Sequence, residues 1–314
     1  MLKGFAYVYP LVGRVAIGEI VREEGKSARP VKHDYFTITT QAKVSGTWVA
    51  HPVQGKLMAS DAEKKLRSIP IRVLFDDPSL VMSESYVAFD KDGRQLCRGD
   101  GQTARQLNAN TSSRSEVPCP GPSYCTSYCA RQCKLLGRLD FSIATDQEAS
   151  GFSFEAFALR TSGFNTVRAL RTKLELFAKA FGGLRGLPLN LVLRTKNTKK
   201  SMSTNFYYVD LELGCGFMEG AKRVKAFKSE ASEAGINLEA MDEMMKSLIS
   251  GDVAETDEDV EEFEEVLASH GFSLNDGWGE PQAQDGEDHT EEMSPRSKNW
   301  VAEGIARGAA TGLI

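Results

Sequence analysis

Histidine is scarce in this sequence, and the catalytic motifs that depend on it are absent. The chain has 4 His among 314 residues, and two of them, His270 and His289, lie in an acidic stretch. His33 and His51 have no Ser or Cys partner at a spacing typical of a catalytic pair. The sequence also lacks a nucleophile elbow, a GxxxxGKS/T loop, an HExxH motif and a dinucleotide fingerprint. We therefore expect that the protein is not an enzyme.

Long apolar runs are missing as well. No run approaches the roughly 20 residues that a membrane-spanning helix needs. The first residues, MLKGFAYVYPLVGR, are too short and too polar for a targeting segment. The hydrophobic fraction of 41% and the charged fraction of 26% are ordinary for a globular protein. We expect a cytoplasmic protein with one large domain or two smaller ones.

Positive charge is absent from one long stretch near the C-terminus. Residues 252–292 contain 16 Asp or Glu and no Lys or Arg, whereas residues 1–251 carry 35 Lys or Arg against 26 Asp or Glu. A basic body favours polyanions, and an acidic extension can shield that surface, recruit a basic partner or simply keep the chain soluble. One short acidic helix is expected at 258–269. The polar composition beyond Gly271 predicts disorder.

Cysteines are present in a cluster. Of the 6 in the chain, four fall in CPGPSYCTSYCARQC as Cys119, Cys125, Cys129 and Cys133, and Cys97 lies upstream in LCRGDG. Since no preceding segment resembles a secretory signal, these thiols are expected to bind a metal rather than form disulfides. Zinc takes four thiolate or imidazole ligands, and a site closed by four sulfurs has no open position for a catalytic water. A structural zinc ion is therefore predicted, the alternative being buried or incidental thiols.

Alternating apolar residues predict a series of strands. They are expected at 15–20, 35–40, 47–53, 69–75, 84–90, 137–144, 152–161, 187–195 and 205–213. Asp92-Gly93 predicts a hairpin turn that brings Cys97 to a strand end, and the GDG at 99–101 is typical of a further turn.

Helical spacing of apolar residues appears in two places. Residues 165–181 form one predicted helix, and 221–250 form a Met-rich helical segment that fits either core packing or a partner's groove. Together these patterns predict an α+β protein with mostly antiparallel sheets, a Cys-rich zinc loop and a β-β-α-β-β unit. The predicted parts are a β-rich region (1–97), the metal-binding loop (98–136), the β-β-α-β-β unit with a C-terminal helix (137–250) and an acidic, largely disordered tail (251–314).

Basic and aromatic residues gather around the predicted second half of the fold. Basic side chains neutralise phosphates and aromatic rings stack on exposed bases. This pattern therefore predicts contact with DNA, single-stranded DNA included. An ordinary solvated surface is the alternative. The candidate residues are Arg160, Arg168, Arg171, Arg194, Lys196, Lys199, Lys200 and Tyr207.

Several segments resemble a known family. They are GRVAIGEI, KHDYFTITT, IPIRVLFDDP, LCRGDGQTARQ, PCPGPSYC, CKLLGRL, FALRTSGFNTVRALRTKL and LPLNLVLRTK. Over residues 10–215 the chain is similar to phage and prophage proteins that include recombination directionality factors, the partners of large serine integrases. Many relatives are described as metal-binding proteins.

The resemblance implies a zinc protein that docks on an integrase in a bacterial host and switches it from integration to excision. It implies Cys97, Cys119, Cys125 and Cys133 as zinc ligands, with Cys129 as a spare thiol able to replace a neighbour and Cys215 as a buried thiol. The function expected is therefore a zinc-stabilised DNA-recombination accessory protein. The alternative is a single-stranded DNA-binding protein with an acidic regulatory tail.

Overall fold

The computed structural model describes residues 10–21, 29–59, 64–90, 94–108, 111, 113–144, 155–197 and 206–249. All of them belong to one compact unit that spans residues 1–277. The predicted acidic helix at 258–269, the tail and the turn residues Asp92 and Gly93 lie outside the described residues.

Twelve strands make up the sheet structure of these residues. Their bounds are β1 (Leu11–Val21), β2 (Arg29–Val44), β3 (Thr47–Ala50), β4 (Ser68–Arg72), β5 (Met82–Phe89), β6 (Gln95–Gly99), β7 (Thr103–Leu107), β8 (Arg114–Pro118), β9 (Lys134–Ile143), β10 (Ala156–Thr161), β11 (Leu189–Lys196) and β12 (Phe206–Leu213). The helices are α1 (Pro52–Ala59), α2 (Pro78–Val81), α3 (Phe164–Phe181), α4 (Phe217–Glu233) and α5 (Leu238–Ile249), with one 3-10 turn, η1 (Ala130–Gln132).

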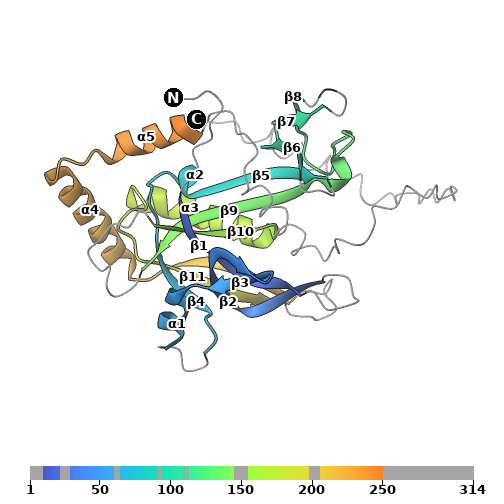
Figure 1. Cartoon of the computed structure of the whole chain (residues 1–314). Helices are drawn as coiled ribbons and strands as arrows, with labels where there is room; N and C mark the ends of the chain where they lie inside the picture. The colour runs from blue at the N-terminus through green and yellow to red at the C-terminus, as the bar shows by residue number, and fades with distance from the viewer. Residues whose placement is uncertain are drawn as a thin grey trace, which may run out of the picture. The chain divides into compact units, whose positions relative to one another are not determined.

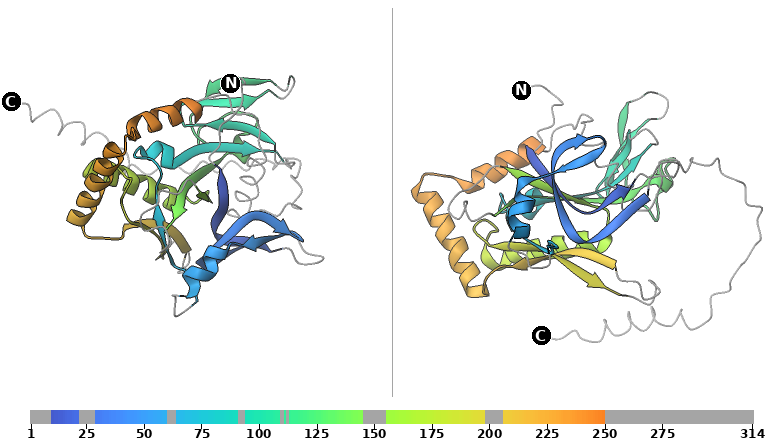
Figure 2. Two further views of the ribbon diagram at one scale, coloured as in Figure 1. Left: turned by 60° about the vertical axis from the view of Figure 1, so that its left-hand side comes forward. Right: turned by 60° about the horizontal axis from the view of Figure 1, so that its bottom comes forward.

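Nine strands lie side by side in the order β3-β2-β1-β10-β9-β5-β6-β7-β8 (Figure 1). β1 and β10 are parallel, and the other described neighbours in this order are antiparallel. Figures 1 and 2 show β6–β8 on the side of the molecule opposite to α4. The expected fold class, α+β with a mostly antiparallel sheet, is thus confirmed.

β9 connects this sheet to three further strands. Its first part pairs with β5, where Leu139 lies opposite Met82, and its last part pairs with β4, where Ile143 lies opposite Ile71. β4 then pairs with β11, and β11 pairs with β12. The order β9, β10, α3, β11, β12 along the chain is that of the predicted β-β-α-β-β unit, but β4 lies between its two strand pairs. These elements therefore do not form a separate unit.

The hydrophobic core lies among the strands around β9 and helix α3. α3 buries Val167, Leu170 and Leu174. Gly137 on β9 permits this approach, because a Cβ at that position would lie 2.7 Å from a Cγ atom of Val167. The predicted helix over 165–181 corresponds to α3, which ends at Gly182 with a φ of 72°, a left-handed conformation that glycine adopts without strain.

Helix α3 also covers the outer edge of β12. Thr166 on α3 accepts a hydrogen bond at its hydroxyl from the backbone N–H of Val209 (3.1 Å). Lys173, two turns further along α3, donates to the carbonyl oxygen of Leu211 (2.9 Å) and to Asp210 (3.1 Å). Side chains of the helix thus satisfy backbone groups that a neighbouring strand would otherwise satisfy.

The segment expected to be helical over 221–250 is divided into α4 and α5. Gly235 lies between the two helices with a φ of 76°, which ends α4. Met245 packs against the core, whereas Met244 is 54% exposed. The methionines therefore serve core packing in part only.

Short elements account for the remaining differences from expectation. α1 follows β3 where a strand was predicted to continue to residue 53, and none of its residues is buried. β7 and β8 lie inside the region predicted as a loop. Their sequences, TARQL and RSEVP, are short and polar, and therefore lack the apolar alternation that predicts a strand. The boundaries expected after residues 97 and 136 fall within β6 and β9. Among the described residues, no helix combines the length and apolar character needed to cross a membrane.

Candidate metal centre

Strands β5 to β8 provide the floor of a small cavity. Cys97 on β6 lies opposite Ala88 on β5 and Gln106 on β7. Two residues further along β6, Gly99 lies opposite Tyr86 and Ala104. Because directly opposed residues and every second residue of a strand share one face of a sheet, these side chains face the same side. Cys97 therefore lies in the middle of β6, not at the strand end where it was expected.

Residues 119–133 cross this face and form the roof. Cys119 follows β8, and its backbone N–H donates to the carbonyl of Gln102 (2.8 Å). At the other end, Cys129 and Cys133 flank the single turn of η1. Tyr128 donates its hydroxyl proton to the carbonyl of Leu107 (2.7 Å), which ties the roof to β7. The Pro- and Gly-containing segment is thus tied to the sheet near its start and near its end.

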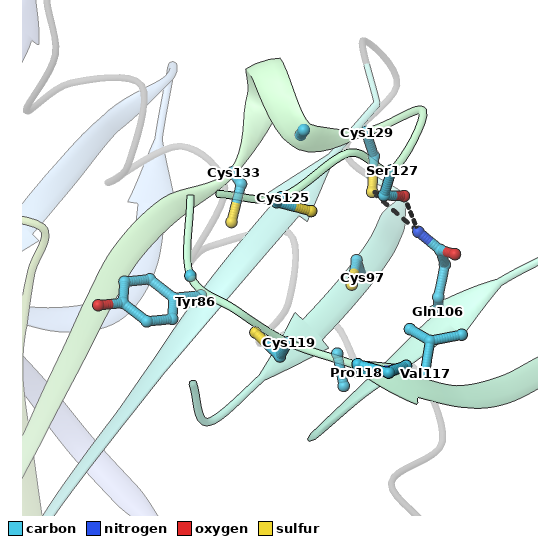
Figure 3. A pocket seen from close by; sticks show the side chains of 13 residues that line it. Tyr86, Cys97, Gln106, Val117, Pro118, Cys119, Cys125, Ser127, Cys129 and Cys133 are labelled. Atoms are coloured by element: carbon cyan, nitrogen blue, oxygen red, sulfur yellow. Dashed lines mark hydrogen bonds between the residues drawn. The ribbon is translucent and has the colours of Figure 1, made fainter. Parts of the chain in front are cut away.

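All five cysteines of this region line the cavity (Figure 3). The predicted ligands Cys97, Cys119, Cys125 and Cys133 are brought together, and Cys129 lies with them. The cavity volume is about 30 Å³, enough for one water molecule or a single ion. Cys215 follows β12 and is half-buried, apart from this set.

Mutual interactions of the thiols change their pKa values. A hydrogen bond to Cys129, followed by burial and the nearby charges of Cys129, Cys133 and Cys119, raises the pKa of Cys97 far above its usual range. The same hydrogen bond lowers the pKa of Cys129 to about 5 against the opposing effect of burial, with help from Ser127 and Gln106. One thiolate is thus favoured at Cys129.

A second effect acts at Cys133. Burial, then the charges of Cys125, Cys119 and Cys129, raises the pKa of Cys133 to about 11. Thiols that disfavour each other's ionisation in this way are the groups whose charge a divalent cation offsets. In the described residues, no group of three or more His, Cys, Asp or Glu is arranged so that it could hold a metal ion. Coordination by four of the thiols therefore requires their sulfurs to draw closer together.

The GDG segment at the mouth of the cavity is a turn. Asp100 accepts hydrogen bonds at one carboxylate oxygen from the backbone N–H groups of Gln102 and Thr103, both at 2.8 Å. These two bonds, the one from Thr103 first, lower the pKa of Asp100. Gly101 has a φ of 97°, which a residue with a side chain rarely adopts. The carboxylate of Asp100 thus stabilises the link between β6 and β7.

Three of the cationic residues proposed for DNA contact are buried or ion-paired. Arg160 on β10 is 6% exposed, because both faces of that strand are covered. Arg171 pairs with Glu175 (2.9 Å) and Glu84 (3.6 Å). Arg194 forms ion pairs with two carboxylates of the neighbouring strand, Asp210 and Glu212. The charge of Arg160 is therefore buried, and the charges of Arg171 and Arg194 are partly offset by neighbouring carboxylates.

The other DNA candidates differ in exposure. Arg168 on α3 and Lys196 at the end of β11 are exposed. Tyr207 on β12 is half-buried. Lys199 and Lys200 lie outside the described residues. Sequence spacing did not reveal the acidic partners of Arg194, because the register of β11 on β12 brings them together.

Two residues that sequence inspection missed contact the thiols. Gln106 donates from Nε2 to the sulfur of Cys129 (3.4 Å), and the hydroxyl of Ser127 lies 3.5 Å from the same sulfur. No local motif marks Gln106, since its place beside Cys97 follows from the pairing of β6 with β7.

Comparison with known proteins gives one family. A family model described as Gp3-like, recombination directionality factor-like, matches residues 12–214. The matched region extends from β1 to the end of β12 and includes the five cysteines of the cavity. The chain matches no curated protein and no solved structure significantly. Because the model covers more than half of its residues, the chain belongs to the Gp3-like, recombination directionality factor-like family.

Proposed function

We propose that this protein is a zinc-stabilised accessory factor of phage-type DNA recombination that acts by binding a large serine integrase. The observation that carries the proposal is the family match over residues 12–214, which includes the whole thiol-lined cavity. The role is non-catalytic: the protein alters which recombination reaction the integrase performs.

The thiol cavity supports a structural zinc ion. Five soft donors surround a space the size of one ion, and zinc sites of this kind use four thiolates. In the proposed holoprotein the metal joins β6, the residue after β8 and the residue before β9. It would thus fix three separate parts of the chain, which explains how so short and polar a region keeps its fold.

The ion pairing and burial of the candidate DNA-contacting arginines favour protein contact over direct DNA contact. Arg171 and Arg194 already pair with carboxylates, and Arg160 is buried. Breaking such partly exposed pairs to contact phosphate offsets a small part of the gain from each new contact. A partner protein with mixed polar and apolar groups can bind without breaking these ion pairs.

The direct test is a recombination assay with the serine integrase of the same mobile element. Purified integrase is incubated with integration substrates or with excision substrates, with and without an equimolar amount of this protein. We expect excision to rise and integration to fall when the protein is present, together with a complex that co-elutes on gel filtration. An integrase whose two activities are both unchanged, and which forms no complex, would exclude the proposed role.

Strand binding is the second candidate function. It is favoured by the excess of basic over acidic residues in 1–251 and by the exposed Arg168 and Lys196. On this proposal the acidic residues of 252–292 compete with the nucleic acid for the basic surface. An oligonucleotide titration distinguishes it from the first candidate.

A further inference from the structure

Cys129 is the most deeply buried thiol of the cavity. It is 2% exposed, against 8% for Cys119, and the other three thiols, Cys97, Cys125 and Cys133, are half-buried. Its position is fixed by η1: the N–H of Gln132 donates to the carbonyl of Cys129 (3.1 Å), and the N–H of Cys133 closes the same turn on Ala130 (3.2 Å). Cys129 and Cys133 are therefore four residues apart on one rigid turn.

The sulfur of Cys129 lies above the cavity floor at Cys97. Gln106, which donates to this sulfur at 3.4 Å, is the cross-strand neighbour of Cys97. A residue that directly opposes another has its Cβ about 5 Å away on the same face. The Gln106 amide thus places the Cys129 sulfur within the reach of Cys97.

Two polar side chains that also line the cavity contact the Cys129 sulfur. The Gln106 amide and the Ser127 hydroxyl both approach it, and the two also hydrogen-bond to each other (Figure 3). Ligating side chains in metal sites commonly have such outer partners, which orient them.

Two other thiols are held by the sheet. Cys119 packs against Gly99, where a Cβ would approach its sulfur to 2.7 Å. Cys133 directly precedes Lys134, which pairs with Val87, and the next residue of β5, Ala88, pairs with Cys97. The sheet therefore places Cys119 at one side of Cys97 and Cys133 at the other, and Cys129 lies above.

We propose that Cys97, Cys119, Cys129 and Cys133 are the four metal ligands, with Gln106 and Ser127 orienting the Cys129 thiolate, and that Cys125 is the fifth, unligated thiol. The assignment rests on the zinc site of the proposed function and replaces Cys125 by Cys129 in the ligand set that the family resemblance implies. Cys125 lies between two exposed residues, Tyr124 (79% exposed) and Thr126.

Cobalt substitution tests the assignment. Co²⁺ is bound to the full chain and to the variants Cys125→Ser and Cys129→Ser, and the thiolate-to-cobalt charge-transfer band is measured per bound metal. We expect Cys125→Ser to keep the band of four thiolates and Cys129→Ser to lose about a quarter of it. The reverse pattern would overturn the assignment and leave the zinc proposal intact. A wild-type chain that binds neither Co²⁺ nor Zn²⁺ would overturn both.

Alkylation of the zinc-loaded chain gives an independent readout. Iodoacetamide should label Cys125 and leave Cys129 unlabelled, as mapped by peptide mass spectrometry, because a bound thiolate is protected from the reagent. Labelling at Cys129 with protection at Cys125 would contradict the proposal.

The orienting role of Ser127 has a matched control. Ser127→Ala should weaken Zn²⁺ binding by about 10-fold or more, the usual effect of removing an outer partner, with an unchanged four-thiolate cobalt spectrum. Ser123→Ala, an exposed position of the same segment, should leave affinity unchanged. Equal affinities for the two variants would show that Ser127 does not orient a ligand.

Discussion

Arg185 and Asp242 form a buried ion pair that attaches α5 to the rest of the fold. The two side chains are 1% and 11% exposed, and Nη2 of Arg185 lies 2.5 Å from Oδ1 of Asp242. The other oxygen of Asp242 accepts from the backbone N–H groups of Asp76 (3.1 Å) and Asp77 (3.3 Å). Arg185 lies within the family match and Asp242 beyond it. The Asp242 carboxylate thus joins α5 to the family's common region, together with the ion pair of Lys246 and Asp77 (2.7 Å) and the packing of Met245 against the core.

Replacing Asp242 should release α5. Asp242→Ala leaves a buried guanidinium without its nearest carboxylate, and removing one partner of a buried pair costs roughly 3–5 kcal/mol. We expect a lower urea midpoint and faster hydrogen exchange in α5. Glu243→Gln is the control, because Glu243 is 75% exposed and its neighbour on the helix. If both variants unfold at the wild-type midpoint, the pair is not what holds the helix.

Acid should weaken the attachment of β2 to the segment before β4. Hydrogen bonds from Lys65 and then Arg67 lower the pKa of Asp34 to about 2, from an ordinary value of 3.8. Since the folded-state pKa is the lower one, this stabilisation is complete above about pH 4 and is lost as the pH falls toward 2. The melting temperature of Asp34→Asn should lie below that of the wild type at pH 7 and meet it near pH 2. The charge control Glu116→Gln should show no such convergence.

Gly99 should tolerate no side chain. A Cβ there would lie 2.7 Å from both the Cβ of Ala104 and the sulfur of Cys119. Gly99→Ala is expected to destabilise by about 1–3 kcal/mol, as overpacking does, and to lower metal affinity by displacing Cys119. At Gly55 in α1 nothing lies within 4 Å of the added Cβ, so Gly55→Ala should stabilise by up to about 1 kcal/mol. Thermal melts of both variants, with and without zinc, check the contrast.

Metal removal should affect one part of the fold more than the rest. The main hydrophobic core contains none of the cysteines, so chelation is expected to open residues 119–133 and β6–β8 while the other strands persist. A metal present at a thousand times its Kd stabilises by about 4 kcal/mol, or roughly 10 °C for a chain of this size. Calorimetry with and without a chelator measures the shift. Identical melting curves for a chain that contains zinc would rule out a structural role for the metal.

Oligonucleotide binding should be weak. We expect the fluorescence anisotropy of a labelled single strand to rise little when micromolar protein is added, since Arg171 and Arg194 are already ion-paired. The titration is performed at two salt concentrations with the full chain and with a chain that ends at Gly251. Tight, salt-sensitive binding that strengthens on truncation would support the strand-binding candidate instead.

Local patterns predicted the elements that present one apolar face. α3 begins one residue before its predicted start and ends at the predicted Phe181, and the antiparallel pairing of β5 with β6 agrees with the expected hairpin. Pairing between distant strands is not encoded in alternation. The parallel match of β1 with β10 and the position of β4 beside β9 were therefore beyond a sequence-based prediction.

For the candidate site, the cysteine cluster could be predicted from the sequence, but the residues around it could not. Close cysteine spacing indicated the cluster, because thiols on one short segment lie near one another in space. Burial on both faces of β10 is not evident from AFALRT, so Arg160 was predicted as a candidate DNA contact although its side chain is 6% exposed. Gln106 could not be predicted as a neighbour of the thiols, because its position beside Cys97 follows from the pairing of β6 with β7.

The hydrogen bonds that Thr166 and Lys173 make to β12 limit how a partner can approach. With these backbone groups occupied by a helix, the β12 edge cannot be extended by a strand from another chain without displacing α3. A partner protein that contacts this side of the molecule must therefore recognise its side chains. Substitutions on the exposed face of α3 then become a way to tune partner choice without altering the sheet.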